Sequence, residues 1–141
     1  MKKTYPIIEY IRPVKIVESH RCEKSSVFLK KYPPVHSFET KHCANLKSGG
    51  FIVLDFGKEY SGGLRILTQF HTNSINNITL RIRLGESLGE VYQEIGEKGA
   101  TNDHSPRDFN VNVPTLSDLT FAQSGFRFAR IDNISECDAS L

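Results

Sequence analysis

The chain has 141 residues, of which 38% are hydrophobic and 24% are charged. This length fits one domain with a sizeable core, and the composition is typical of a globular rather than a disordered protein. The formal net charge of +2 is too small to indicate a nucleic-acid partner, and no segment approaches the roughly 20 consecutive apolar residues of a membrane span.

Short stretches of alternating apolar and polar residues run through most of the chain. In chain order, the predicted strands are residues 14–17, 27–29, 51–56, 64–70, 78–84, 109–113, 119–121 and 126–128. Pairs or runs of Gly, Asn, Pro and Ser between them indicate turns at 33–34, 49–50, 62–63, 73–77 and 124–125. Many short strands with little helix predict an all-β fold, an antiparallel β-sandwich of jelly-roll type, in a single domain spanning 1–141.

One segment departs from the strand pattern. Residues 87–96 predict a short amphipathic helix with one apolar stripe, in which Ser87 and Glu90 form a capping box. The stripe consists of Leu88, Val91, Tyr92 and Ile95. An apolar stripe must be buried against something. We expect it to face a partner domain, so that the isolated chain self-associates through this segment. The alternative is that the stripe packs on its own sandwich and the chain stays monomeric.

The helix begins a long excursion, residues 86–106, between two predicted strands. Asp, Asn and Arg can bind the vicinal hydroxyls of a sugar, with an aromatic ring beside them. The carbohydrate-binding or interdomain candidates are Glu86, Tyr92, Asn102, Asp103, His104, Arg107 and Asp108. The alternative is a polar loop whose side chains only satisfy turns.

Metal, cofactor and catalytic sites have no clear signal. His20 with Cys22 and His42 with Cys43 lack the spacing of structural zinc sites, and three widely spaced cysteines give no disulfide framework. We therefore assign no metal, no cofactor and no catalytic residue.

Several arginines are expected to form charge pairs between neighbouring strands rather than a nucleic-acid site. They are Arg81, Arg83, Arg127 and Arg130, with Asp55, Glu59 and Asp132 as partners.

Four blocks together resemble a known module. The segments 54–59 (LDFGKE), 62–66 (GGLRI), 82–86 (IRLGE) and 125–131 (GFRFARI) are similar to the non-catalytic N-terminal β-sandwich module of bacterial α-L-rhamnosidase-type glycoside hydrolases. The polar stretches 100–103 and 107–108 resemble that module's link to its next strand. The match is strongest over 51–134, and residues 10–14 match only loosely.

The resemblance implies an accessory role. In such enzymes the catalytic carboxylates lie in an α/α barrel that follows the sandwich, whereas this chain ends at Leu141, shortly after the closing strand. We expect this chain alone to be inactive, with a downstream catalytic domain of the same polypeptide and a rhamnose-containing glycan as partners, and neither nucleic acid nor membrane. The alternative is a free-standing, lectin-like carbohydrate-binding module. No signal-peptide pattern is visible, so cytoplasmic is the default expectation.

Overall fold

The computed structural model describes residues 7–31, 42–71, 77–94, 96–98 and 107–141. The elements are β1 (Lys15–Glu23), the 3-10 helix η1 (Ser25–Leu29), β2 (Asn45–Leu67), β3 (Ile78–Gly85), α1 (Leu88–Tyr92), β4 (Asp108–Val113), β5 (Asp118–Asn133) and β6 (Ala139–Ser140). All pairings are antiparallel, in the order β1-β2-β5-β3-β4 with β6 on β2, so the predicted all-β sandwich is confirmed. In the described part of the chain, no helix has the length and apolar character needed to cross a membrane.

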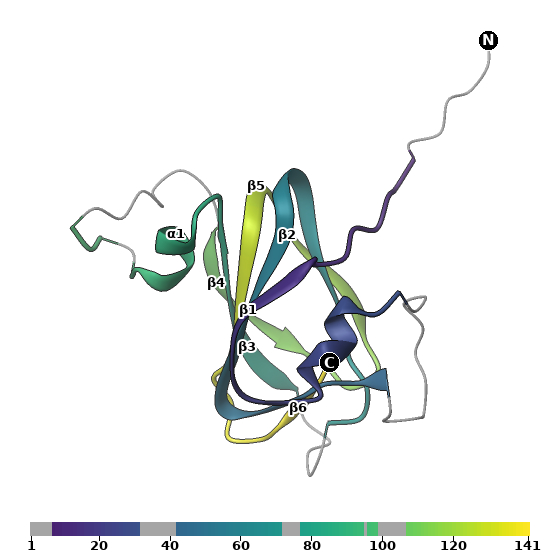
Figure 1. Ribbon diagram of the computed structural model, residues 1–141. Helices are drawn as coiled ribbons and strands as arrows, with labels where there is room; N and C mark the ends of the chain where they lie inside the picture. Colours follow the sequence, from purple (N-terminus) through teal and green to yellow (C-terminus); the bar gives the residue numbers. More distant parts are fainter. Residues whose placement is uncertain (1–6, 32–41, 72–76, 95, 99–106) are drawn as a thin grey trace.

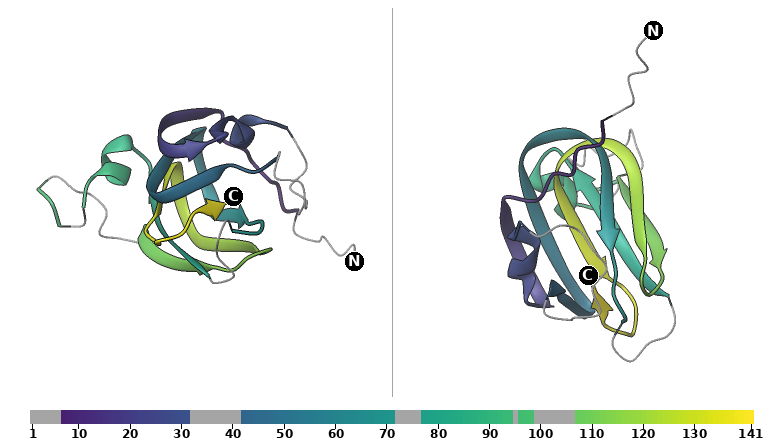
Figure 2. Two further views of the ribbon diagram at one scale, coloured as in Figure 1. Left: turned by 90° about the horizontal axis from the view of Figure 1, so that it is seen from below. Right: turned by 90° about the vertical axis from the view of Figure 1, so that its right-hand side faces the viewer.

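Two long strands, β2 and β5, pair with each other and connect the two layers of the sandwich. β2 and β5 pair from Phe51 opposite Asp132 to Leu67 opposite Asp118, and their register shifts between Asp55 and Tyr60. At that irregularity both strands arch over the same end of the molecule, as the right-hand view of Figure 2 shows. Each strand therefore contributes its two halves to the two layers of the sandwich (Figure 1).

An ion pair fastens the two strands at the bend. Arg127 donates from Nε and Nη2 to the two carboxylate oxygens of Asp55 at 2.8 and 2.9 Å, and Oδ1 also accepts the N–H of Gly57 at 2.7 Å. These bonds from Arg127 hold the pKa of the Asp55 carboxyl below its ordinary value. The expected cross-strand pairs Arg127–Asp55 and Arg83–Asp132 are confirmed, whereas Arg130 binds Asp132 on its own strand.

The core lies between the layers and follows the predicted alternation. Every second residue of β3, from Ile78 to Leu84, is almost fully buried. The facing residues come from both halves of the long strands, including Ile52, Leu54, Leu64 and Ile66. This burial of alternate side chains from both sheets is what the period-two pattern predicts.

Four sequence interpretations are corrected. The pairs 49–50, 62–63 and 124–125 are not turns but lie inside β2 and β5, and residues 27–29 belong to η1 rather than to a strand. Gly50 and Gly63 serve close packing instead. A Cβ on Gly50 would lie 2.8 Å from the carbonyl oxygen of Arg21, and one on Gly63 would lie 2.6 Å from Cγ2 of Thr120.

A second, smaller cluster lies on the opposite face of the sheet, beneath α1. It joins Val53, Val91 and Phe128, with Phe51 and Val17 packed beside them. The helix is shorter than predicted and ends at Tyr92, although its Ser87–Glu90 capping box is present. The expectation that the apolar stripe faces a partner is corrected for Val91, which is fully buried on this chain's own sheet. Ile95 lies outside the described residues.

Phe128 lies in this second cluster rather than with Phe126 in the main core. The alternation across Arg127 predicts that both rings share a face, but the register shift at the bend separates them. A β-bulge changes the face toward which the following side chains point, and the alternation in the sequence does not indicate where the bulge lies.

Phe128→Ala should lower the free energy of unfolding by about 3–5 kcal/mol, because the ring is buried between the sheet and α1. Chemical denaturation measures this change, with Phe70→Ala as a control because Phe70 is 57% exposed. Equal midpoints for the Phe128 variant and the wild type would contradict this assignment.

A buried histidine links the end of β4 to β6. The Nδ1 atom of His71 accepts the N–H of Ser140 at 3.3 Å, so Nε2 carries the proton and donates to the carbonyl oxygen of Val113 at 3.2 Å. Burial lowers the pKa of His71 below its ordinary value. A second proton on Nδ1 would face the Ser140 N–H group, so protonation opposes this contact.

Because the pKa of His71 is lower in the folded than in the unfolded chain, its contribution to stability is complete above about pH 6.5 and is lost as the pH falls through the folded-state pKa. The unfolding midpoint of the wild type should therefore decline between pH 7 and 5, and His71→Gln should flatten this decline. The exposed His20, changed to Gln, is the matched control and should leave the slope unchanged. Parallel pH profiles for wild type and His71→Gln would refute the assignment.

Candidate functional site

The predicted site residues that the structure describes gather around α1, where they form ion pairs. Arg107 donates to Glu86 at 2.7 Å and to Glu90 at 3.1 Å. Glu90 also accepts the backbone N–H of Glu86 at 2.5 Å, which ties the first turn of the helix to the strand before it. Asn102, Asp103 and His104 lie outside the described residues.

The other two candidates anchor the far side of α1. Asp108 accepts two hydrogen bonds from Arg81, at 2.8 and 2.5 Å, and Arg81 also binds Glu94. Tyr92 donates its hydroxyl to Glu18 on β1, and its ring lies 5.3 Å from the guanidinium carbon of Arg130. Burial, followed by the bond to Glu18, raises the pKa of Tyr92 to about 12, so the hydroxyl stays protonated as a donor.

These contacts give the region around α1 a structural role. The bonds from Arg81 hold the pKa of Glu94 below its ordinary value, and the guanidinium of Arg107 lies against both Glu86 and Glu90. A general acid in glycoside hydrolysis needs a raised pKa so that it can deliver a proton. Carboxylates paired with arginines have the opposite tendency. The network instead fastens α1 to its own sheet.

The described residues contain no group of three or more His, Cys, Asp or Glu side chains that could hold a metal ion. Cys22, Cys43 and Cys137 are free thiols, and burial raises the pKa of Cys22 to about 11. A thiol with a raised pKa is a weak nucleophile and a weak metal ligand at neutral pH.

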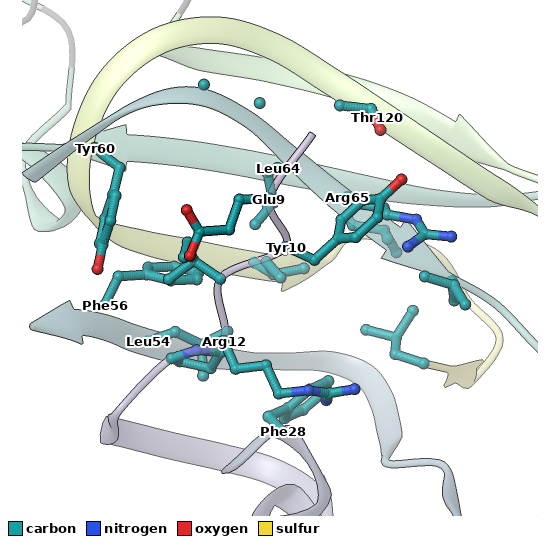
Figure 3. A pocket seen from close by; sticks show the side chains of 18 of the residues that line it. Glu9, Tyr10, Arg12, Phe28, Leu54, Phe56, Tyr60, Leu64, Arg65 and Thr120 are labelled. Carbon is teal, nitrogen blue, oxygen red and sulfur yellow. The ribbon is translucent and has the colours of Figure 1, made fainter. Parts of the chain in front are cut away.

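A hollow of about 1060 Å³ lies on the other side of the molecule, and Figure 3 shows it from close by. It is lined by residues from both halves of β2, by residues of β5, and by residues 7–13. Residues 7–13 cross this opening without strand pairing, and we call them the N-terminal strap. Phe28 of η1 lines the hollow beside the strap.

The floor of the hollow is apolar, and its rim is polar and aromatic. Core side chains form the floor, among them Leu54, Phe56 and Leu64. The side chains around them that can make polar contacts include Glu9, Tyr10, Arg12, His42, Tyr60, Ser61, Arg65, Gln69, Thr120 and Gln123. Ligand pockets commonly combine an apolar lining with a few polar groups that fix orientation.

The rim is most highly organised at Arg65. Its Nε and Nη2 atoms donate to Asp118 at 2.7 and 2.5 Å, and the ring of Tyr10 lies 4.3 Å from its guanidinium carbon. Within the described residues, Nη1 of Arg65 has no hydrogen-bond acceptor, while Tyr10 is 59% exposed. The pair thus presents a donor, an acceptor and an aromatic face, and it carries no net charge.

Sequence reasoning missed this site. Tyr10 and Arg65 are far apart in the chain, and Arg65 has the appearance of an ordinary outward-facing strand residue. The strap shows no regular periodicity, and the only signal in it was the loose resemblance over residues 10–14. Its position across the open side of the sandwich depends on how the two long strands bend.

Comparisons with known proteins match the fold. No family model and no curated protein matches the sequence. A solved structure described as a rhamnosidase from Klebsiella oxytoca with rhamnose bound has a TM-score of 0.60 at 19% identity, covering 92% of this chain and 26% of that one. A second, CBM32 of AlyQ in complex with 4,5-unsaturated mannuronic acid, has a TM-score of 0.55 at 12% identity, covering 92% of this chain and 91% of that one. The chain therefore has the β-sandwich fold of both, and it spans about a quarter of the rhamnosidase chain.

Proposed function

We propose that this chain is a non-catalytic carbohydrate-binding β-sandwich module that accompanies an α-L-rhamnosidase-like glycoside hydrolase. The observation that carries the binding role is the hollow, with its apolar floor and its Arg65–Asp118 pair beneath Tyr10. The likeness in fold to part of a rhamnosidase chain and to a carbohydrate-binding module supports the same proposal.

The chemistry of the rim suits a sugar. One face of a pyranose ring carries mainly C–H groups, which pack against an aromatic ring, while its hydroxyls both donate and accept hydrogen bonds. Arg65 would donate from Nη1 to one hydroxyl, and Asp118 would accept from the next. Tyr10 and Tyr60 would supply the aromatic faces. Because the ion pair is neutral overall, an uncharged sugar fits it without leaving an unpaired charge.

The accessory role rests on where the resembling blocks lie. Segments 54–59 and 125–131 meet at the bend, where Asp55 binds Arg127. Segment 82–86 ends β3 and leads to the Glu86–Arg107 pair. These blocks build the sandwich rather than a reaction centre. The partner in this proposal is a catalytic domain of the same polypeptide, and Leu88 and Tyr92, each more than a third exposed, are the apolar side chains that α1 could offer it.

A free-standing carbohydrate-binding module is the second candidate. It is favoured by the match to a module of which this chain covers 91%. The two candidates share the binding role and differ in whether a catalytic domain follows in the same reading frame. The length of that open reading frame distinguishes them.

The first test is direct binding. Isothermal titration of the 141-residue chain with an L-rhamnose-terminated oligosaccharide should give saturable binding. Arg65→Ala and Tyr10→Ala should each weaken it by about tenfold, because each removes a hydrogen-bonding or stacking contact worth roughly 1 kcal/mol or more.

The control variant is Tyr92→Phe, which removes a hydroxyl at α1 and leaves the hollow intact. Its affinity should equal that of the wild type. Loss of binding in Tyr92→Phe, together with full binding in Arg65→Ala, would move the site to the residues around α1.

The second test concerns catalysis. The purified chain should not hydrolyse an aryl α-L-rhamnoside. This reaction needs one carboxyl group as acid and a second as base or nucleophile, whereas the described carboxylates Glu86, Glu90 and Glu94 around α1 are paired with arginines. A chromogenic assay measures this. Turnover that follows the protein through purification and disappears in Glu86→Gln would contradict the prediction.

A further inference from the structure

The hollow is bordered by an open strand edge. The first half of β2 pairs with β1 on one side and β5 on the other, whereas Tyr60–Leu67 pairs with β5 alone in the described part of the chain. An antiparallel strand paired on one side directs about half of its backbone N–H and C=O groups away from that partner. Ser61, Gly62 and Gly63 lie on this edge and line the hollow.

Gly62 has no structural reason to be glycine within the described residues. Its φ angle lies outside the left-handed region, and a Cβ built on it would have no atom within 4 Å. Its neighbour differs, because a Cβ on Gly63 would collide with Thr120 at 2.6 Å and with the carbonyl oxygen of Ala122 at 2.8 Å. Glycine inside a strand weakens it, and often marks a place where a ligand or another backbone approaches closely.

The position of Gly62 places this gap inside the hollow. The register of β2 with β5 shifts between Gly62 and Leu64, but the extra residue there is on β5, between Ser124 and Phe121. Alternation on β2 therefore continues, and Gly62 lies between Tyr60 and Leu64 on one face of the strand. Tyr60 is partly buried against the core, and Leu64 belongs to it. The missing side chain therefore leaves a notch between an aromatic ring and a leucine, next to backbone groups of β2 that no strand in the described part of the chain pairs with.

We propose that Gly62 determines which saccharides enter the hollow, by letting a sugar ring lie in the notch beside Tyr60 and hydrogen-bond to the open backbone edge of β2. This proposal rests on the carbohydrate-binding function above and names a residue that positions its ligand. The hydroxyls of the sugar take the place that a neighbouring strand would occupy.

The geometry makes a sharp prediction for substitution at this position. Gly62→Ala and Gly62→Val add side-chain atoms to empty space without backbone strain, so the unfolding midpoint of each should be equal to or higher than that of the wild type. The same atoms fill the notch. Affinity for the L-rhamnose-terminated oligosaccharide should therefore fall, by about tenfold or more for Val, since small changes in pocket volume alter affinity on that scale.

Gly89→Ala is the matched control. Gly89 lies in α1, away from the hollow, and the nearest atom to its added Cβ is Oγ of Ser87 at 3.8 Å. This variant should keep wild-type affinity and gain stability, because alanine favours helix over glycine.

The experiment titrates wild type, Gly62→Ala, Gly62→Val and Gly89→Ala with the L-rhamnose-terminated oligosaccharide and with an oligomannuronate. Reduced affinity in the Gly62 variants, at unchanged stability, supports the proposal. Binding that is equal in Gly62→Val and wild type overturns the role of Gly62 while the carbohydrate-binding function stands. Failure of the wild type to bind either saccharide overturns both.

Discussion

The antiparallel pairing of β2 with β5 through a shared bend is the constraint on which the rest of the structure depends. These strands run beside each other from one layer to the next, with the register shift between Asp55 and Tyr60 marking the change of direction. Arg127 and Asp55 fasten the two strands where that shift begins, and the Gly57 N–H completes the carboxylate's bonding. Because this carboxylate is almost buried, removing Arg127 would leave a charge without its partner, which is far more costly than losing an exposed pair.

The bend has a different consequence on each face. On the inner face, both halves of β2 and part of β5 line the hollow beneath the strap. On the outer face, the changed register directs Phe128 away from the core, where it forms a second cluster with Val53 and Val91. The hollow and the cluster that α1 packs on thus lie on opposite faces of the same two bent strands.

Sequence reasoning predicted what depends on local pattern. Alternation located β3 and β4 almost to the residue, and the spacing of Ser87 and Glu90 located the start of α1. It failed where long-range pairing decides the outcome. Gly62-Gly63 reads as a turn, but paired strands carry the chain straight through it. The ion pairs that Arg107 and Arg81 form with the carboxylates around α1 also have no signal in the sequence. Tyr10 and Arg65 meet only after the chain has bent, so their contact has no local signal.

We propose that carbohydrate binds in the hollow and not around α1. Mapping amide chemical-shift changes on the ¹⁵N-labelled chain during titration with an L-rhamnose-terminated oligosaccharide tests this claim most directly. We expect the largest chemical-shift changes at the amides of the strap and of β2 from Tyr60 to Arg65, and almost none in α1. The opposite result would contradict binding in the hollow: chemical-shift changes confined to Glu86–Tyr92 and Arg107–Asp108, with no change in the strap.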